Sequence, residues 1–229
     1  MKSVYLVLMP GLDGTGLLFR PLLKALPEFI KPIIVSYPTD KILGYDKLTS
    51  YIVEHLPNDE PFVLLGESFG GPLALKVAAR KPVMLKGVVL CASFVACPFP
   101  FIPLVTKKLL RPFLFSYLKL FAKLNAYAGS RLSVDIEKSL SLTQNEVLAE
   151  RVKEIMQVDV SRELDNCDLP ILYLRGIKDY VVPKWNLQRI LKIKPNINDV
   201  SINSSHMLLQ TQAVQAVEAI HNFIAGLKY

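Results

Sequence analysis

The pentapeptide Gly66-Glu67-Ser68-Phe69-Gly70 has the residue types and spacing of an activated serine nucleophile. It follows the apolar run 62–65, which predicts a buried strand, and precedes a stretch with helical spacing that begins near Gly70. A serine in so sharp a strand-to-helix turn is strained, and flanking glycines avoid collisions with the neighbouring strand and helix. Gly and Ser also form ordinary turns, but the flanking strand and helix favour a nucleophile at Ser68, at a helix N-terminus that favours developing negative charge.

A serine hydroxyl is a poor nucleophile at neutral pH and needs a base within hydrogen-bond reach. The sequence offers three histidines. His55 ends a helical stretch among polar residues, and His221 lies inside the C-terminal helical stretch, so both have ordinary structural interpretations. His206 follows the last predicted strand, at the strand edge where parallel sheets place their active sites. We therefore predict that His206 is the general base.

A carboxylate must orient this histidine. Asp179 comes just after the predicted strand 171–174 and therefore lies at its carboxyl end. Asp165 and Asp168 precede the same strand and lie at the wrong end. The order Ser68, Asp179, His206 along the chain is also one in which such triads occur. These placements predict a Ser-Asp-His triad.

Acyl chemistry also requires two donors for the oxyanion of the tetrahedral intermediate. The N–H of Phe69 follows the nucleophile directly and is the first candidate. The turn after the first strand, Met9-Pro-Gly-Leu-Asp-Gly-Thr-Gly, provides the second, for which we favour the N–H of Leu12. A phosphate-binding interpretation of this turn is weaker, because the turn lacks the lysine of a P-loop and the G-x-G-x-x-G spacing.

Short apolar runs separated by amphipathic stretches predict an α/β fold with a mostly parallel sheet of about six strands and helices on both faces. Only the last run is polar enough to predict an edge strand. The predicted strands are 4–9, 33–36, 62–65, 87–91, 171–174 and 199–202, and the predicted helices are 17–26, 45–55, 70–80, 184–191 and 208–227.

A long interruption after the fourth strand has helical patterning of its own and predicts a lid over one end of the sheet. We therefore expect a core of residues 1–97 and 169–229 with a helical insertion at 98–168. Residues 102–124 combine apolar side chains with Lys107, Lys108 and Arg111. We interpret them as a lid helix over an acyl pocket; the alternative is contact with a membrane surface or an acidic acyl carrier.

Composition narrows the class of protein further. The net charge of +7 is spread along the chain without a nucleic-acid motif, so no nucleic-acid partner is expected. Three cysteines show no disulfide or metal spacing, and the N-terminal apolar run is too short for an export signal, which together favour a reducing, cytoplasmic location. Residues 87–106 are uncharged and long enough to span a bilayer, but clustered prolines and a predicted strand argue against a membrane helix. We expect no metal or organic cofactor.

With Gly66-Glu-Ser-Phe-Gly, Gly176-Ile-Lys-Asp and Ser205-His206 in this order, the sequence resembles the α/β-hydrolase superfamily over essentially its whole length. Pro10-Gly-Leu-Asp-Gly-Thr-Gly is similar to the esterase, lipase and thioesterase branch that includes phytyl ester synthases. Pro10-Gly11 replaces the His-Gly of many esterases, and the two antiparallel strands usual at the N-terminus are not expected here. The resemblance implies acyl chemistry through an acyl-serine.

The expected activity is hydrolysis of small-molecule carboxylic esters with hydrophobic or medium-chain acyl groups. An acyl thioesterase or a carrier-linked acyl methyl esterase is the first alternative, and an acyltransferase is the second. A non-catalytic binding member of the fold is a further alternative, although such a protein would normally lack a triad residue.

Overall fold

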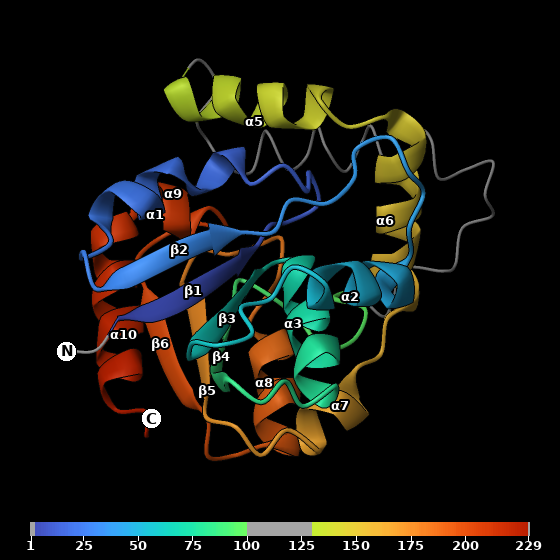
Figure 1. Cartoon of the computed structure of the whole chain (residues 1–229). Helices are drawn as coiled ribbons and strands as arrows, with labels where there is room; N and C mark the ends of the chain where they lie inside the picture. The colour runs from blue at the N-terminus through green and yellow to red at the C-terminus, as the bar shows by residue number, and fades with distance from the viewer. Residues whose placement is uncertain (1–2, 100–129, 229) are drawn as a thin grey trace.

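The computed structural model describes residues 3–99 and 130–228, which form an α/β structure around one sheet (Figure 1). Six parallel strands lie in the order β2-β1-β3-β4-β5-β6. Their bounds are Val4–Met9 (β1), Ile30–Ile34 (β2), Phe62–Glu67 (β3), Leu85–Cys91 (β4), Ile171–Gly176 (β5) and Asn198–Ile202 (β6). Each predicted strand is present, and the α/β-hydrolase fold class is confirmed.

The sequence pattern predicts one edge strand of the sheet correctly and gives no signal for the other. Strand β6 is largely exposed and lies at one edge, as its polarity predicts. The other edge is β2, whose apolar sequence gave no such signal and whose strand begins three residues earlier than predicted. Pro32 within it is tolerated because an edge strand leaves one side of its backbone unpaired.

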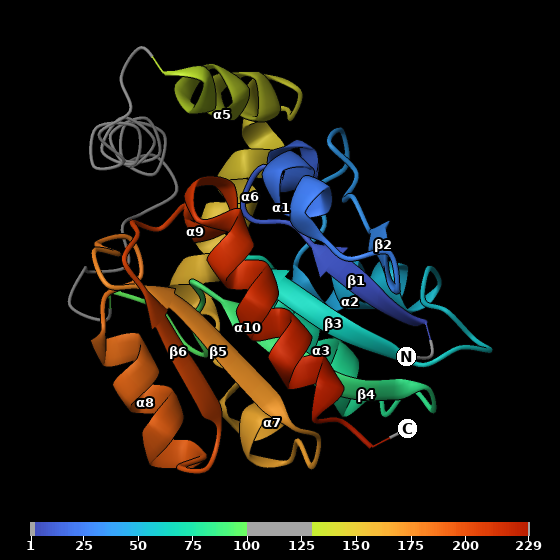
Figure 2. The ribbon, with the colours of Figure 1, turned by 90° about the vertical axis from the view of Figure 1, so that its left-hand side faces the viewer.

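Helices cover both faces of the sheet, so the core consists of two apolar layers (Figure 2). One layer contains residues of α2 (Tyr45–Val53), α3 (Gly70–Ala79), α7 (Ser161–Asp165) and α8 (Trp185–Ile193). The other contains residues of the 3-10 turn η1 (Leu17–Phe19), α1 (Arg20–Ala25), α9 (Leu208–Thr211) and α10 (Ala213–Ala225). Two predicted helices are divided in the structure. The predicted helix 17–26 consists of η1 and α1, and the predicted helix 208–227 is interrupted at Gln212, whose backbone is not helical.

The chain between β4 and β5 leaves the sheet and forms α5 (Arg131–Ser141) and α6 (Asn145–Gln157) before α7. Figure 1 shows α5 beyond the carboxyl end of β1, and α6 beside α2. The Glu154 carboxylate of α6 accepts a 2.6 Å hydrogen bond from the N–H of Tyr45. The whole segment 102–124, with Lys107, Lys108 and Arg111, lies outside the described residues, and the boundaries 98–168 stay a prediction.

The described part of the uncharged segment 87–106 is residues 87–99, of which those up to Cys91 belong to the central strand β4. Within residues 3–99 and 130–228, none of the helices combines the length and the apolar character that crossing a membrane requires.

Candidate active site

Ser68 lies in the turn between β3 and α3 with a backbone φ of 51°, a left-handed conformation that is unusual for a residue with a side chain. Its N–H donates to the carbonyl of Cys91 at 2.9 Å, and its carbonyl accepts from the Ser93 hydroxyl at 2.7 Å. The neighbouring strand thus holds the turn from both sides. This is the strained geometry that the sequence predicts for an exposed nucleophile.

Glycines at positions 66 and 70 are required by close backbone approaches. A Cβ at Gly66 would lie 2.3 Å from the carbonyl oxygen of Gly70, and a Cβ at Gly70 would lie 2.4 Å from that of Met9. Both separations are far below van der Waals contact. A side chain at position 66 would therefore collide with the start of α3, and one at position 70 with the end of β1, which explains the G-x-S-x-G pattern.

His206 and Asp179 come from the carboxyl ends of the two neighbouring strands β6 and β5 and form a buried pair. The Nδ1 of His206 lies 2.9 Å from Oδ2 of Asp179. The other carboxylate oxygen, Oδ1, accepts the N–H groups of Val181 at 2.9 Å and Val182 at 2.8 Å. Both oxygens of Asp179 are therefore engaged, which fixes the carboxylate against the imidazole.

The electrostatic surroundings favour a protonated imidazole. Burial on its own would lower the pKa of His206, but the charge and hydrogen bond of Asp179, together with the charge of Glu67, raise it above its ordinary value of 6.5. A base with a raised pKa accepts a proton more readily, which suits a general base.

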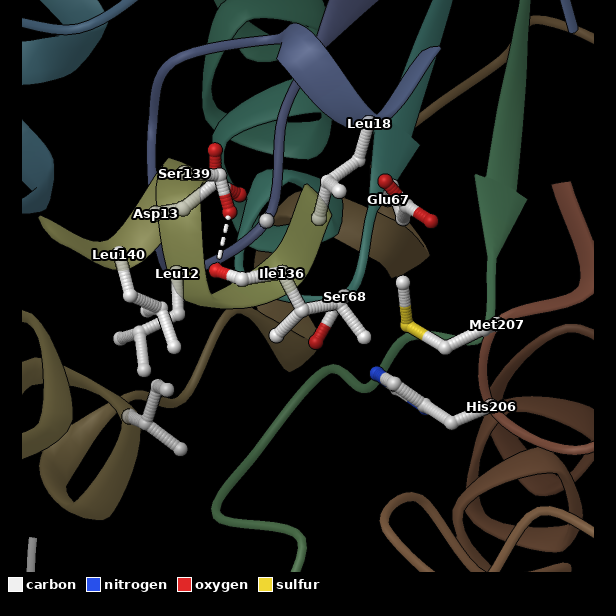
Figure 3. A pocket seen from close by; sticks show the side chains of 12 residues that line it. Leu12, Asp13, Leu18, Glu67, Ser68, Ile136, Ser139, Leu140, His206 and Met207 are labelled. Carbon is white, nitrogen blue, oxygen red and sulfur yellow. Dashed lines mark hydrogen bonds between the residues drawn. The ribbon is translucent and has the colours of Figure 1, made fainter. Parts of the chain in front are cut away.

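Ser68 and His206 line one pocket, in which their side chains point toward one another (Figure 3). Asp179 lies behind His206 and is not part of the wall. The Ser139 hydroxyl, on α5, donates to the Ile136 carbonyl of the same helix at 2.9 Å. The rest of the wall is mostly apolar and includes Leu12, Leu18, Ile136, Leu140, Ile155 and Met207.

The turn after β1 reaches the same pocket through Gly11, Leu12 and Asp13. It is closed by a 3.1 Å hydrogen bond from the N–H of Gly14 to the carbonyl of Gly11. Neither Leu12 nor Phe69, the two predicted oxyanion donors, gives its N–H to any other described residue. Their role as oxyanion donors stays a prediction.

Three polar residues at the site carried no signal in the sequence. Gln210 of α9 donates from Nε2 to Glu67 at 2.9 Å, and Arg151 of α6 binds the turn after β1. The carboxylate of Asp13 accepts from the N–H of Thr15 at 2.9 Å and from its hydroxyl. Glu67 itself is buried, which raises its pKa from 4.5 to about 7 despite the opposing effects of Gln210 and the charge of His206.

The other two histidines do not line the pocket. His55 is exposed, with Nδ1 2.7 Å from the carbonyl of Tyr51, and His221 packs edge-on against the ring of Phe29. Across the described parts of the chain, His, Cys, Asp and Glu side chains form no cluster of three or more suited to a metal ion.

Comparisons with known proteins place the chain in a family. Residues 39–201, well over half of the chain, match the family described as serine aminopeptidase, S33. A pimeloyl-[acyl-carrier protein] methyl ester esterase from Shewanella woodyi is 26% identical over 83% of this chain and 80% of its own length.

Two further similarities have a narrower meaning. Phytyl ester synthase 1 from Arabidopsis thaliana is 35% identical over 33% of this chain and 12% of its own length. An esterase structure from Exiguobacterium antarcticum superimposes with a TM-score of 0.80, covering 98% of this chain and 93% of that one, at 17% identity. Such a low identity supports the fold alone, whereas the match over residues 39–201 shows that the chain belongs to the serine aminopeptidase S33 family of α/β-hydrolases.

Proposed function

We propose that the chain is a serine carboxylic ester hydrolase for hydrophobic or medium-chain acyl esters, acting through an acyl-serine intermediate. The observation that carries the proposal is the buried pair of His206 Nδ1 and Asp179 Oδ2, 2.9 Å apart, with the imidazole facing Ser68 in an apolar pocket. The N–H groups of Leu12, in the pocket wall, and of Phe69, the residue after Ser68, donate to no other described residue, and the apolar wall suits an acyl chain.

The reaction follows from these positions. Ser68 Oγ attacks the ester carbonyl carbon while its proton passes to Nε2 of His206, and Asp179 accepts the hydrogen bond of Nδ1–H and stabilises the imidazolium. The N–H groups of Leu12 and Phe69 bind the oxyanion. Collapse expels the alkoxide, which takes the proton from His206 and leaves as the alcohol. Water then attacks the acyl-serine by the same sequence, releasing the acid and restoring Ser68.

Labelling with a fluorophosphonate, followed by mass mapping of the adduct, tests the nucleophile. We expect a single adduct on Ser68, none on the Ser68→Ala variant, and loss of p-nitrophenyl ester hydrolysis in that variant with an unchanged melting temperature. Undiminished turnover by folded Ser68→Ala would disprove the assignment. No labelling of the folded unaltered protein would instead support a non-catalytic binding member of the fold.

A carrier-linked acyl methyl esterase or a thioesterase is the second candidate. It is favoured by the similarity to the carrier-linked methyl ester esterase, which extends over 83% of this chain. Lys107, Lys108 and Arg111 would then meet the acidic carrier. Replacing all three with glutamine should reduce turnover of a carrier-bound acyl ester and leave p-nitrophenyl esters unaffected; equal losses on both substrates would argue against carrier recognition.

An acyltransferase activity is favoured only by the partial similarity to a phytyl ester synthase, which covers 33% of this chain. It would appear as ester products when long-chain alcohols compete with water for the acyl-enzyme.

The three free cysteines are compatible with the cytoplasmic location that we propose.

A further inference from the structure

The carbonyl groups of the turn after β1 accept hydrogen bonds from residues that do not line the pocket. Five consecutive carbonyl oxygens, from Pro10 to Gly14, accept hydrogen bonds. The donors are Tyr37 Oη on Pro10 (3.0 Å), the N–H of Gly14 on Gly11 (3.1 Å), Arg151 Nη1 on Leu12 (2.9 Å), Arg151 Nη1 and Thr143 Oγ1 on Asp13 (both 2.8 Å), and the N–H of Tyr37 on Gly14 (2.8 Å). The inserted helical segment thus supplies every donor to the carbonyls of Leu12 and Asp13.

Arg151 is the main donor and is almost completely buried, with 1% of its surface exposed. Its Nη2 donates to the carbonyl of Pro38 at 2.9 Å, so the guanidinium bridges the turn and the segment after β2. Burial lowers the pKa of this guanidinium, and within the described residues no carboxylate forms a salt bridge with it. Backbone carbonyls and the Tyr37 ring, 5.4 Å away, contact the guanidinium in place of a salt bridge, and the charge of Asp13 opposes the effect of burial on its pKa.

The turn and the guanidinium also fit each other sterically. Gly14 has a φ of +73°, and a Cβ at this position would lie 2.4 Å from Nη1 of Arg151. The space beside the turn is therefore filled by the guanidinium itself. A side chain at position 14 would displace Arg151 from the carbonyls of Leu12 and Asp13.

We propose that Arg151, assisted by Thr143, is a positioning residue of the oxyanion hole: by binding the carbonyls of Leu12 and Asp13, it holds the turn so that the N–H of Leu12 faces Ser68. This inference rests on the proposed ester hydrolysis. It gives the inserted segment a second role besides covering the acyl group, because α6 fixes the position of a catalytic donor.

The Asp13 carbonyl that Arg151 and Thr143 bind shares its peptide with the N–H of Gly14, which donates to the carbonyl of Gly11. The Gly11 carbonyl shares its peptide with the N–H of Leu12, so loss of the donors to Asp13 would allow these peptides to rotate and direct the N–H of Leu12 away from the pocket.

A positioning role predicts a loss in the chemical step. Removing one oxyanion donor from a serine hydrolase costs about 10²–10³-fold in kcat. Because a loosened turn still presents Leu12 part of the time, we expect Arg151→Met to lose roughly 10–100-fold in kcat with little change in KM.

The control is Val147→Ala, a buried position on the same helix that forms no hydrogen bond to the turn through its side chain. It should lower the melting temperature while retaining kcat. A trifluoromethyl ketone, which forms an oxyanion on Ser68, provides a second readout. Its affinity for Arg151→Met should fall by the same factor as kcat/KM, whereas the affinity of the carboxylic acid product should stay constant.

Thr143→Val provides an independent test if Arg151→Met does not fold. It removes only the 2.8 Å bond to Asp13 and should reduce kcat in the same direction by a smaller factor. The proposal is overturned if the variants that fold keep kcat within about twofold of Val147→Ala, or if ketone and product affinities fall together. Failure of ester hydrolysis itself would appear separately, as an unaltered protein without turnover and without labelling at Ser68.

Discussion

The carboxylate of Glu67 accepts a 2.9 Å hydrogen bond from the side-chain amide of Gln210, which ties the residue before Ser68 to the helix that follows His206. Glu67 is buried, lines the pocket and interacts electrostatically with His206. The other titratable groups coupled to it are Asp13 on the turn after β1, Tyr37 after β2 and Cys91 on β4. A group that titrates near neutral pH therefore lies beside the proposed nucleophile and base.

Glu67→Gln should shift the pH dependence of hydrolysis. The negative charge of Glu67 helps to raise the pKa of His206, so its removal should lower that pKa and move the acid limb of the kcat/KM profile to lower pH. Glu150→Gln, which removes a charge from α6, should leave the profile in place. An acid limb that stays fixed or moves to higher pH in Glu67→Gln would contradict this coupling.

The same substitution should alter stability in a pH-dependent way. The pKa of Glu67 is about 7 when folded against an ordinary value of 4.5, so the folded state binds the extra proton between these pH values. The stabilisation is fully present below pH 4.5 and is lost as the pH rises through 7, at most about 3 kcal/mol. Glu67→Gln should therefore be more stable than the unaltered protein at pH 8 and similar to it at pH 4.5. Urea unfolding at the two pH values measures the difference in unfolding free energy between the variant and the unaltered protein. The same difference at both pH values would refute the raised pKa of Glu67.

Much of this fold follows from the sequence because its four central strands are buried on both faces and their sequences are mostly apolar runs. The six runs predict six strands, and β1 agrees with the prediction at both ends. The start of β2 is set instead by register, since Val4 pairs with Ile30, and no local pattern encodes such a pairing. The helix break at Gln212 is likewise absent from the apolar spacing, which continues across it.

The residues of the candidate site likewise differ in whether the sequence predicts them. Ser68, Asp179 and His206 could be placed because each directly follows a predicted strand, so topology alone brings them to one edge of the sheet. Arg151 could not, because it binds a carbonyl 139 positions earlier in the chain. An arginine in an amphipathic helix gives the same local pattern whether it meets water or a buried turn.

Gly70→Ala should destabilise the protein, whereas Gly11→Ala should not. A Cβ at Gly70 would lie 2.4 Å from the carbonyl oxygen of Met9 and 2.9 Å from that of Pro10, forcing the end of β1 away from the Ser68 turn. A cost of about 1–3 kcal/mol or more is expected for such overpacking. At Gly11 the nearest atom is the Cβ of Ser68 at 3.7 Å, an ordinary contact. Thermal melts compare the two, and equal melting temperatures would show that the close approach at Gly70 relaxes without strain.

Asp179→Asn should abolish most of the activity and preserve the fold. Asparagine keeps a side-chain oxygen for the N–H groups of Val181 and Val182, which now bind Oδ1 of Asp179. Its amide group would then face Nδ1 of His206 and favour the tautomer that cannot accept the Ser68 proton, a change expected to cost about 10⁴-fold in kcat. Asp179→Ala, which also loses the two backbone hydrogen bonds, should be less stable as well as inactive. If Asp179→Asn kept more than about a tenth of the unaltered kcat, His206 would not depend on this carboxylate for its orientation, and the buried pair would be structural.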